Sequence, residues 1–245
     1  MKENKYDDKA FFEKYRQMPR SVQGLEAAGE WHALKKLLPP LKDSSVLDLG
    51  CGFGWHCRYA AEQGAARVLG VDLSDSMLDE AKRTTPHPTV CYERSSIEDF
   101  TFPEGGFDVV ISSLALHYVE GYAALCRNVA ASLRPGGTFV FSVEHPIFTA
   151  QGPQDWHYDA SGKPDYWPVD RYFEQGVRTA VFLDEPVTKY HRTLTTYVQK
   201  LLDAGFVITA LVEPEPDPSM LDSVPGMRDE LRRPMMLLLS ARMPG

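Results

Sequence analysis

The sequence lacks the cysteine pairs and the long apolar run that would mark a secreted, metal-binding or membrane-spanning chain. Its four cysteines, Cys51, Cys57, Cys91 and Cys126, form no CxxC pair and have no histidine at metal-ligand spacing. We therefore expect reduced thiols and no metal site. Apolar runs such as Met235 to Leu239 are far shorter than the roughly 20 residues that a membrane-spanning helix needs.

Positive charge is also in the minority. The chain has 26 Lys and Arg against 34 Asp and Glu, a net charge of −8, and no basic run. Binding to duplex nucleic acid draws its affinity from clustered Lys and Arg, so we expect a small-molecule partner and neither a nucleic acid nor a membrane. The first ten residues carry charges of both signs, so we expect no signal peptide and a cytoplasmic location. Oligomeric state, a homodimer included, is left open.

The order of apolar and amphipathic segments indicates the fold class. From residue 46 the apolar runs VLDLG, RVLGVD, TVCYER, FDVVIS and TFVFSVE alternate with amphipathic stretches, and FVITALVE and MMLLLSA follow near the end. Such runs are typical of buried strands, and the stretches between them are typical of crossover helices. The sequence therefore predicts an α/β fold with a doubly wound, mostly parallel seven-stranded sheet.

A glycine-rich segment follows the first predicted strand. VLDLGCGFGWHC places Gly50, Gly52 and Gly54 between that strand and a helix, and Asp72 ends the next strand. Glycines let the backbone approach a ligand closely, and the carboxylate is placed to hold ribose hydroxyls. The combination predicts a cofactor that contains a nucleoside. A dinucleotide site would have a third glycine where Trp55 stands, so this position argues against NAD. An NAD(P)-dependent oxidoreductase is the alternative interpretation.

With these features, the sequence from Val46 to Glu144 resembles the class I S-adenosylmethionine-dependent methyltransferases, in their small-molecule, type 11-like branch. The resemblance implies a Rossmann-like sheet with an antiparallel last strand. It also implies S-adenosyl-L-methionine as methyl donor and S-adenosyl-L-homocysteine as product. The family's glycine loop, D-x-G-x-G-x-G, is matched by the cofactor-binding positions Asp48, Gly50, Cys51, Gly52 and Gly54.

Other positions match cofactor contacts of the family. They are Arg20 for the carboxylate, Asp72 for the ribose, Leu73, Met77, Ser96 and Ile97 around the adenine, and Ser113 near the methionine part. Ser96 stands in SSIEDF where the family has an aspartate for the adenine amino group, so the backbone of Ile97 is the remaining reader of the ring edge.

The resemblance implies that the chain divides by function within a single domain, 1–245. Residues 1–42 form an N-terminal helical cover, 43–145 the cofactor-binding core, 146–192 a lid or substrate insertion, and 193–245 the rest of the core. The insertion holds nine of the 27 aromatic residues. A segment of that composition is typical of a pocket wall, which favours a small, planar or apolar acceptor.

The implied reaction is in-line methyl transfer, for which the protein mainly aligns the acceptor. An acceptor that carries a proton needs a base within hydrogen-bond reach. His117 and His145 follow strands four and five, and His191 lies in the insertion, so these three are the predicted catalytic residues. The sequence leaves the acceptor atom open, and it also leaves open a cofactor-binding protein without catalysis.

Overall fold

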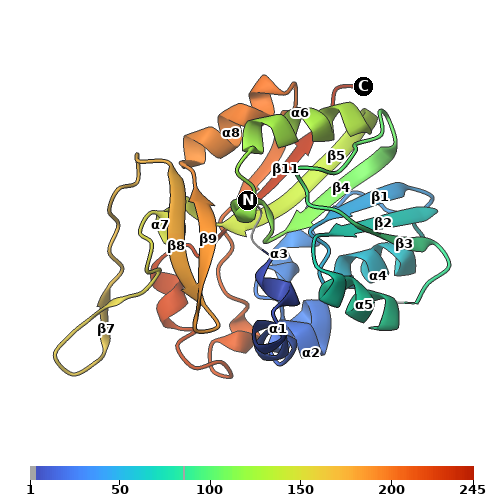
Figure 1. Ribbon diagram of the computed structural model, residues 1–245. Helices are drawn as coiled ribbons and strands as arrows, with labels where there is room; N and C mark the ends of the chain where they lie inside the picture. Colours follow the sequence, from blue (N-terminus) through green and yellow to red (C-terminus); the bar gives the residue numbers. More distant parts are fainter. Residues whose placement is uncertain (1–3, 85) are drawn as a thin grey trace.

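The computed structural model describes residues 4–84 and 86–245, so residues 1–3, within the stretch from which we expect no signal peptide, lie outside it. Its centre is a seven-stranded sheet in the order β10-β11-β5-β4-β1-β2-β3 (Figure 1). The strands are β1 (Ser45–Leu49), β2 (Arg67–Asp72), β3 (Val90–Arg94), β4 (Phe107–Ser113), β5 (Leu133–Glu144), β10 (Val207–Val212) and β11 (Met236–Arg242). β11 runs antiparallel to β5 and β10, and the pairs among β1 to β5 are parallel. The predicted sheet is confirmed.

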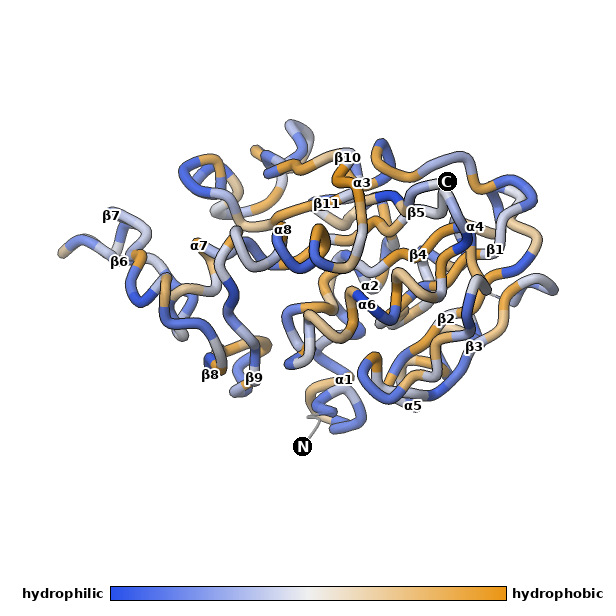
Figure 2. Tube along the Cα trace, turned by 90° about the horizontal axis from the view of Figure 1, so that it is seen from above, coloured by the Kyte–Doolittle hydropathy of each residue, from blue (hydrophilic) through white to orange (hydrophobic). Residues whose placement is uncertain are grey.

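Helices cover both faces of this sheet. One face carries α3 (Trp31–Leu34), α4 (Trp55–Glu62) and α5 (Asp75–Thr84), and the other carries α6 (Tyr122–Ser132) and α8 (Leu194–Asp203). Because side chains alternate along a strand, Val46 packs with Ala60 of α4, whereas Leu47 joins the cluster of Val129 on α6. Figure 2 shows the apolar residues gathered along these central strands. No helix of the described residues is long and apolar enough to cross a membrane.

The N-terminal cover, described here from residue 4 to residue 42, is a chain of short helical pieces. They are the 3-10 turn η1 (Lys5–Asp7), α1 (Lys9–Arg16), α2 (Pro19–Gln23), the 3-10 turn η2 (Gly24–Ala27) and α3. Asp8 caps α1 by accepting the backbone N–H groups of Ala10 and Phe11. Pro19 suits the first turn of α2, and Gly24 ends that helix at φ 72°. The predicted helical cover is therefore divided into short pieces at residues that break helices.

The insertion, residues 146–192, contains α7 (Pro146–Thr149) and two hairpins. One hairpin pairs β6 (His157–Tyr158) with β7 (Pro164–Tyr166), and the other pairs β8 (Gly176–Phe182) with β9 (Glu185–His191). Leu183 and Asp184, at the tip of β8–β9, both have positive φ, as the two-residue turns that match strand twist require. The hairpins project to one side of the sheet (Figure 1).

The cover and the insertion meet each other. Phe11 of α1 packs with Ala180 and Val187 of the hairpin β8–β9 in one apolar cluster. Lys14 Nζ donates to the carbonyl oxygen of Leu183 over 3.0 Å, and it lies 3.2 Å from the Asp184 carboxylate. Segments from distant parts of the chain are thus joined beside the carboxyl ends of the central strands.

Three aromatic side chains of the insertion pack around Arg233, a residue of the same chain outside the insertion. The Arg233 guanidinium lies 3.9 Å from the ring centroid of Trp167, 4.8 Å from that of Phe148 and 5.2 Å from that of Trp156. It also forms an ion pair with Glu230 at 2.7 Å. These rings bind a cation of the same chain, so part of the insertion's aromatic surface stabilises the insertion itself.

Candidate active site

A cavity of about 560 Å³ lies where the cover, the core and the insertion meet. Its wall includes most of the predicted cofactor-binding residues: Arg20, Gly50, Gly52, Asp72, Leu73, Met77, Ser96, Ile97 and Ser113. The parallel strands bring these side chains together because their carboxyl ends lie at the same edge of the sheet. Asp48, Cys51 and Gly54 do not line this cavity.

The glycine loop between β1 and α4 has the backbone shape that only glycine adopts easily. Gly50 and Gly54 both have φ 73°, and a Cβ atom would meet Ala115 at the first position and Tyr92 at the second. Gly54 therefore serves the turn into α4, while Gly50 and Gly52 present their backbone to the cavity.

Asp48, Cys51 and Cys57 are buried within or next to the glycine loop. Asp48 is 1% exposed, and its Oδ2 atom accepts a hydrogen bond from the Cys57 thiol at 3.3 Å. Its Oδ1 atom has no hydrogen-bond partner among the described residues. Burial raises the pKa of Asp48 to about 7 and that of Cys51 to about 11. A thiol so far from ionisation is a packing group and no nucleophile.

Asp72 is fixed by backbone groups on two sides. Its Oδ2 atom accepts the N–H of Gly52 at 2.9 Å, and its Oδ1 atom accepts the N–H of Ser74 at 3.0 Å. Burial raises the pKa of Asp72, and these hydrogen bonds partly offset that effect. The carboxylate is thus held at the end of β2, in the position expected for binding a ribose.

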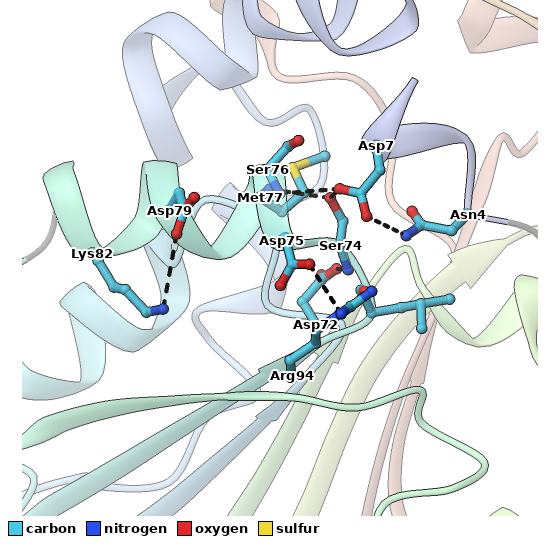
Figure 3. A network of polar contacts seen from close by, with 11 residues as sticks. Asn4, Asp7, Asp72, Ser74, Asp75, Ser76, Met77, Asp79, Lys82 and Arg94 are labelled. Atoms are coloured by element: carbon cyan, nitrogen blue, oxygen red, sulfur yellow. Dashed lines mark hydrogen bonds and ion pairs between the residues drawn. The ribbon is translucent and has the colours of Figure 1, made fainter. Parts of the chain in front are cut away.

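Asp7 of the cover reaches the same place, which the sequence did not indicate. Its Oδ1 atom accepts from the Ser74 hydroxyl at 2.6 Å and from the Ser76 N–H at 3.0 Å, while its Oδ2 atom accepts from Asn4 at 2.6 Å. Figure 3 shows this carboxylate near Ser74 and Ser76, with Asp72 on the far side of Ser74. The cover is therefore fastened to the loop that holds the predicted ribose ligand.

Arg20 lies on the cavity wall but is paired within the chain. Its Nη2 atom is 3.3 Å from Glu30 Oε1, which also accepts the Ser113 hydroxyl at 2.9 Å. Burial opposes the charge on Glu30, but Arg20 and the hydrogen bonds outweigh it, so the pKa of Glu30 lies below its ordinary value. The sequence predicted Arg20 and Ser113, whereas Glu30 comes from a part of the cover with no motif.

A small cavity of about 50 Å³ beside Arg20 and Ser113 tests whether the residues fit the methionine part of the cofactor. Among the described residues, Glu30 Oε2, Ser21 Oγ and Trp55 Nε1 are buried there or nearby without a hydrogen-bond partner. Buried polar atoms without partners are costly unless a ligand or water satisfies them. A guanidinium and a carboxylate beside such atoms suit a ligand end that carries one carboxylate and one ammonium group.

Ser96 and Ile97, which are predicted to contact the adenine, lie on the cavity wall after β3. The Ser96 hydroxyl donates to Asp99 Oδ2 at 2.8 Å and accepts the Asp99 N–H at 3.0 Å. These local bonds shape the turn after β3. The predicted contact from the backbone of Ile97 is consistent with its place on the cavity wall.

Of the three predicted catalytic histidines, only His117 lines the cavity. Burial lowers the pKa of His117 to about 4, so the ring is neutral near pH 7. Its Nδ1 atom accepts the N–H of Glu144 at 3.4 Å. A neutral ring that accepts at Nδ1 carries its proton on Nε2, so the second nitrogen is a hydrogen-bond donor.

The structure does not bring His145 and His191 to the cavity, which is a correction to the expected geometry. His145 Nδ1 accepts the Ile147 N–H at 3.0 Å and caps α7, and its Nε2 atom lies 2.8 Å from Glu213. His191 is buried between the Thr149 hydroxyl and the Tyr172 carbonyl oxygen, both at 2.8 Å. Both nitrogens of His191 are thus engaged within the insertion, and Nδ1 of His145 is engaged in capping α7.

The fold and the site define an α/β protein that binds a nucleoside cofactor at the carboxyl ends of parallel strands. The profile of a methyltransferase domain family matches residues 47–141. The N-demethylindolmycin N-methyltransferase of Streptomyces griseus is 31% identical over 71% of this chain and 75% of its own length. An uncharacterised protein of Haemophilus influenzae is 34% identical over 97% of this chain and 96% of its own.

Two solved structures are more similar still. A chain from Listeria monocytogenes, solved as an S-adenosylmethionine-dependent methyltransferase, is 57% identical with a TM-score of 0.86, covering 91% of this chain and 100% of its own. The corresponding enzyme of Mesorhizobium loti is 46% identical with a TM-score of 0.83, covering 89% and 100%. This chain belongs to the S-adenosylmethionine-dependent methyltransferases. Its cofactor is S-adenosylmethionine, and the oxidoreductase and non-catalytic alternatives are wrong.

Proposed function

We propose that this methyltransferase acts on a small, planar or apolar molecule held between the cofactor and the insertion. The observation that carries the proposal is the cavity of about 560 Å³, whose wall includes both the predicted cofactor-binding residues and apolar residues of the insertion. Small-molecule sites commonly have such volumes and mix apolar walls with a few polar groups. The apolar wall includes Phe148, Phe182 and Val187 of the insertion.

The cofactor supplies a methyl group already activated by a positively charged sulfur. Around it, we infer that Asp72 binds the ribose hydroxyls, that Arg20 and Glu30 bind the charged methionine end, and that Gly50 and Gly52 lie under its chain. Residues of both the cover and the insertion line the cavity. Alignment is the main contribution of the protein to such a displacement.

Two properties support a small acceptor over a nucleic acid. The net charge is −8, which opposes binding to a phosphate backbone. The hairpin β8–β9 of the insertion also flanks the cavity and contributes the apolar side chains of Phe182 and Val187 to its wall. A wall of this kind suits a small molecule.

The cofactor site is tested by calorimetric titration with S-adenosylhomocysteine. The wild-type protein should bind it, and Asp72→Ala should weaken binding by about 100-fold, because two hydroxyl hydrogen bonds to a carboxylate are lost. Asp79→Ala, an exposed site on α5 that no cavity wall includes, is the matched control. Absence of binding to the wild-type protein would refute the proposed cofactor site.

The acceptor class is tested by measuring S-adenosylhomocysteine formation with small planar molecules and, in parallel, with tRNA. Turnover that requires tRNA, or that occurs only with phosphorylated acceptors, would overturn the proposal for the acceptor while leaving the cofactor site intact.

A further inference from the structure

A lysine occupies an inward position of the insertion. Along β9 the side chains of Val187, Lys189 and His191 are buried, and those between them are more exposed. Lys189 is 3% exposed and lies on the cavity wall. An apolar residue would close this face of the hairpin with no desolvation of a charge, so the lysine requires a reason of its own.

Lys189 belongs to a closed ring of three polar side chains. Its Nζ atom donates to Glu144 Oε1 at 2.6 Å and to Gln154 Oε1 at 2.8 Å, while Gln154 Nε2 donates to Glu144 Oε2 at 2.8 Å. All three residues line the cavity. Burial opposes the charge on Glu144, but His117, Lys189 and the hydrogen bonds outweigh it, so the pKa of Glu144 lies below its ordinary value.

The backbone at Gln154 is strained to complete this ring. Its φ of 54° lies in the left-handed region, which costs a residue other than glycine about 1 kcal/mol or more. Such strain is retained where the surrounding structure fixes a group for use. Here it places both ends of one amide between a carboxylate and an ammonium group.

Counting donors and acceptors shows what the ring offers to the cavity. Each Glu144 oxygen accepts one hydrogen bond within the ring, whereas Lys189 has given two of its three N–H groups and Gln154 one of its two. His117 adds the N–H on its Nε2 atom, because its Nδ1 atom accepts from the backbone of Glu144. Lys189, Gln154 and His117 therefore each keep one N–H group for a ligand.

We propose that Glu144, Lys189, Gln154 and His117 form the acceptor-recognition site, and that it binds an oxygen atom of the acceptor: a carbonyl, hydroxyl or phenolate oxygen. The inference rests on the proposed function, since it names the chemistry of the molecule that shares the cavity. Lys189 and Gln154 are the specificity-determining residues, and Glu144 positions both of them. An ammonium group offers only donors, so it cannot accept a hydrogen bond from these three N–H groups.

The site also makes recognition depend on the closed insertion. Glu144 ends β5 of the core, whereas Lys189 and Gln154 belong to the insertion. The donors therefore assemble only when β9 lies against the core. An ion pair with only a structural role would also hold the insertion against the core, but it would give no preference among ligands. Measuring the preference among ligands therefore separates a recognition role from a structural role.

The test uses protein saturated with S-adenosylhomocysteine and four aromatic probes of similar size: phenol, acetophenone, toluene and benzylammonium. Their dissociation constants are measured by ligand-observed NMR. Phenol and acetophenone should bind about tenfold more tightly than toluene, as one hydrogen bond to a charged donor implies. Benzylammonium, which cannot accept a hydrogen bond, should bind more weakly than phenol and acetophenone.

The variant Lys189→Met with Glu144→Gln removes both charges and keeps the side-chain lengths. It should bind S-adenosylhomocysteine normally and bind all four probes within about twofold of one another. The matched control, Lys200→Met with Asp203→Asn, removes an exposed ion pair on α8 and should keep the preference for oxygen. If the first variant fails to fold, Gln154→Leu leaves the ion pair in place and should still lose part of the preference.

The proposal is overturned if toluene or benzylammonium binds wild-type protein as tightly as phenol, or if the charge-free variant keeps the preference for oxygen. Failure of the wild-type protein to bind S-adenosylhomocysteine would instead count against the proposed function. The two failures are therefore distinguishable in one set of titrations.

Discussion

The buried carboxyl group of Asp48 makes the stability of this protein depend on pH in a calculable way. Its pKa is about 7 in the folded protein, against an ordinary value of 3.8. Between these values the folded protein keeps a proton that the unfolded chain has lost, so stability falls as the pH rises from about 4 to about 7. A difference of about three in pKa corresponds to at most about 4 kcal/mol, present in full above pH 7.

Replacement of Asp48 by asparagine removes this cost and keeps the shape of the side chain. At pH 8, Asp48→Asn should raise the free energy of unfolding by up to about 4 kcal/mol, whereas at pH 4 the two proteins should be nearly equal. Urea unfolding of the cofactor-free protein at a series of pH values measures the difference directly. Asp79→Asn, at an exposed position of α5, should follow the wild-type curve. A difference between Asp48→Asn and wild type that is the same at pH 4 and pH 8 would refute the buried, raised-pKa carboxyl group.

Other predictions concern the cover, the insertion and the histidine on the cavity wall. Asp7→Asn should speed dissociation of S-adenosylhomocysteine about tenfold, because it weakens two charged hydrogen bonds at α5; stopped-flow measurement against Asp79→Asn checks this, and equal rates would contradict it. Arg233→Met should lower stability by about 2 kcal/mol and speed proteolysis of the insertion, whereas the exposed Arg228→Met should not. Because the pKa of His117 is about 4, the rate of methyl transfer should show no histidine titration between about pH 5.5 and 8.5; an inflection that His117→Gln abolishes would show that the ring ionises in this range.

The core could be predicted because its signals are local. Each central strand is a short apolar run, and the glycine loop and Asp72 have a spacing that places them on neighbouring strand ends. The hairpin β8–β9 gave a weaker signal, since the outward residues Val177 and Val181 are apolar and blur the alternation. Its turn also uses Leu183 and Asp184 in place of the usual asparagine and glycine.

Residues of the candidate site were predicted where a motif lies within one segment of the sequence. Contacts between segments that are distant in the sequence were missed. Glu30 faces Ser113 across 83 positions of sequence, and no motif reports such a pair. The position of His145 after strand five and that of His191 in the insertion were read from the sequence, but the directions of their side chains depend on local hydrogen bonds. Pro146 begins α7 directly after His145, so that ring turns to cap the helix.

The contact between α1 and the tip of β8–β9 has a kinetic consequence. Phe11 and Lys14 bind the hairpin that covers the acceptor side, while Asp7, a few residues earlier, is fastened over the cofactor side. Outward movement of either α1 or the hairpin β8–β9 breaks contacts with the other segment. The free-energy cost of opening the site therefore includes the contacts between both segments. We therefore expect both products to depart in one concerted event, with the turnover rate set by the loosening of this joint.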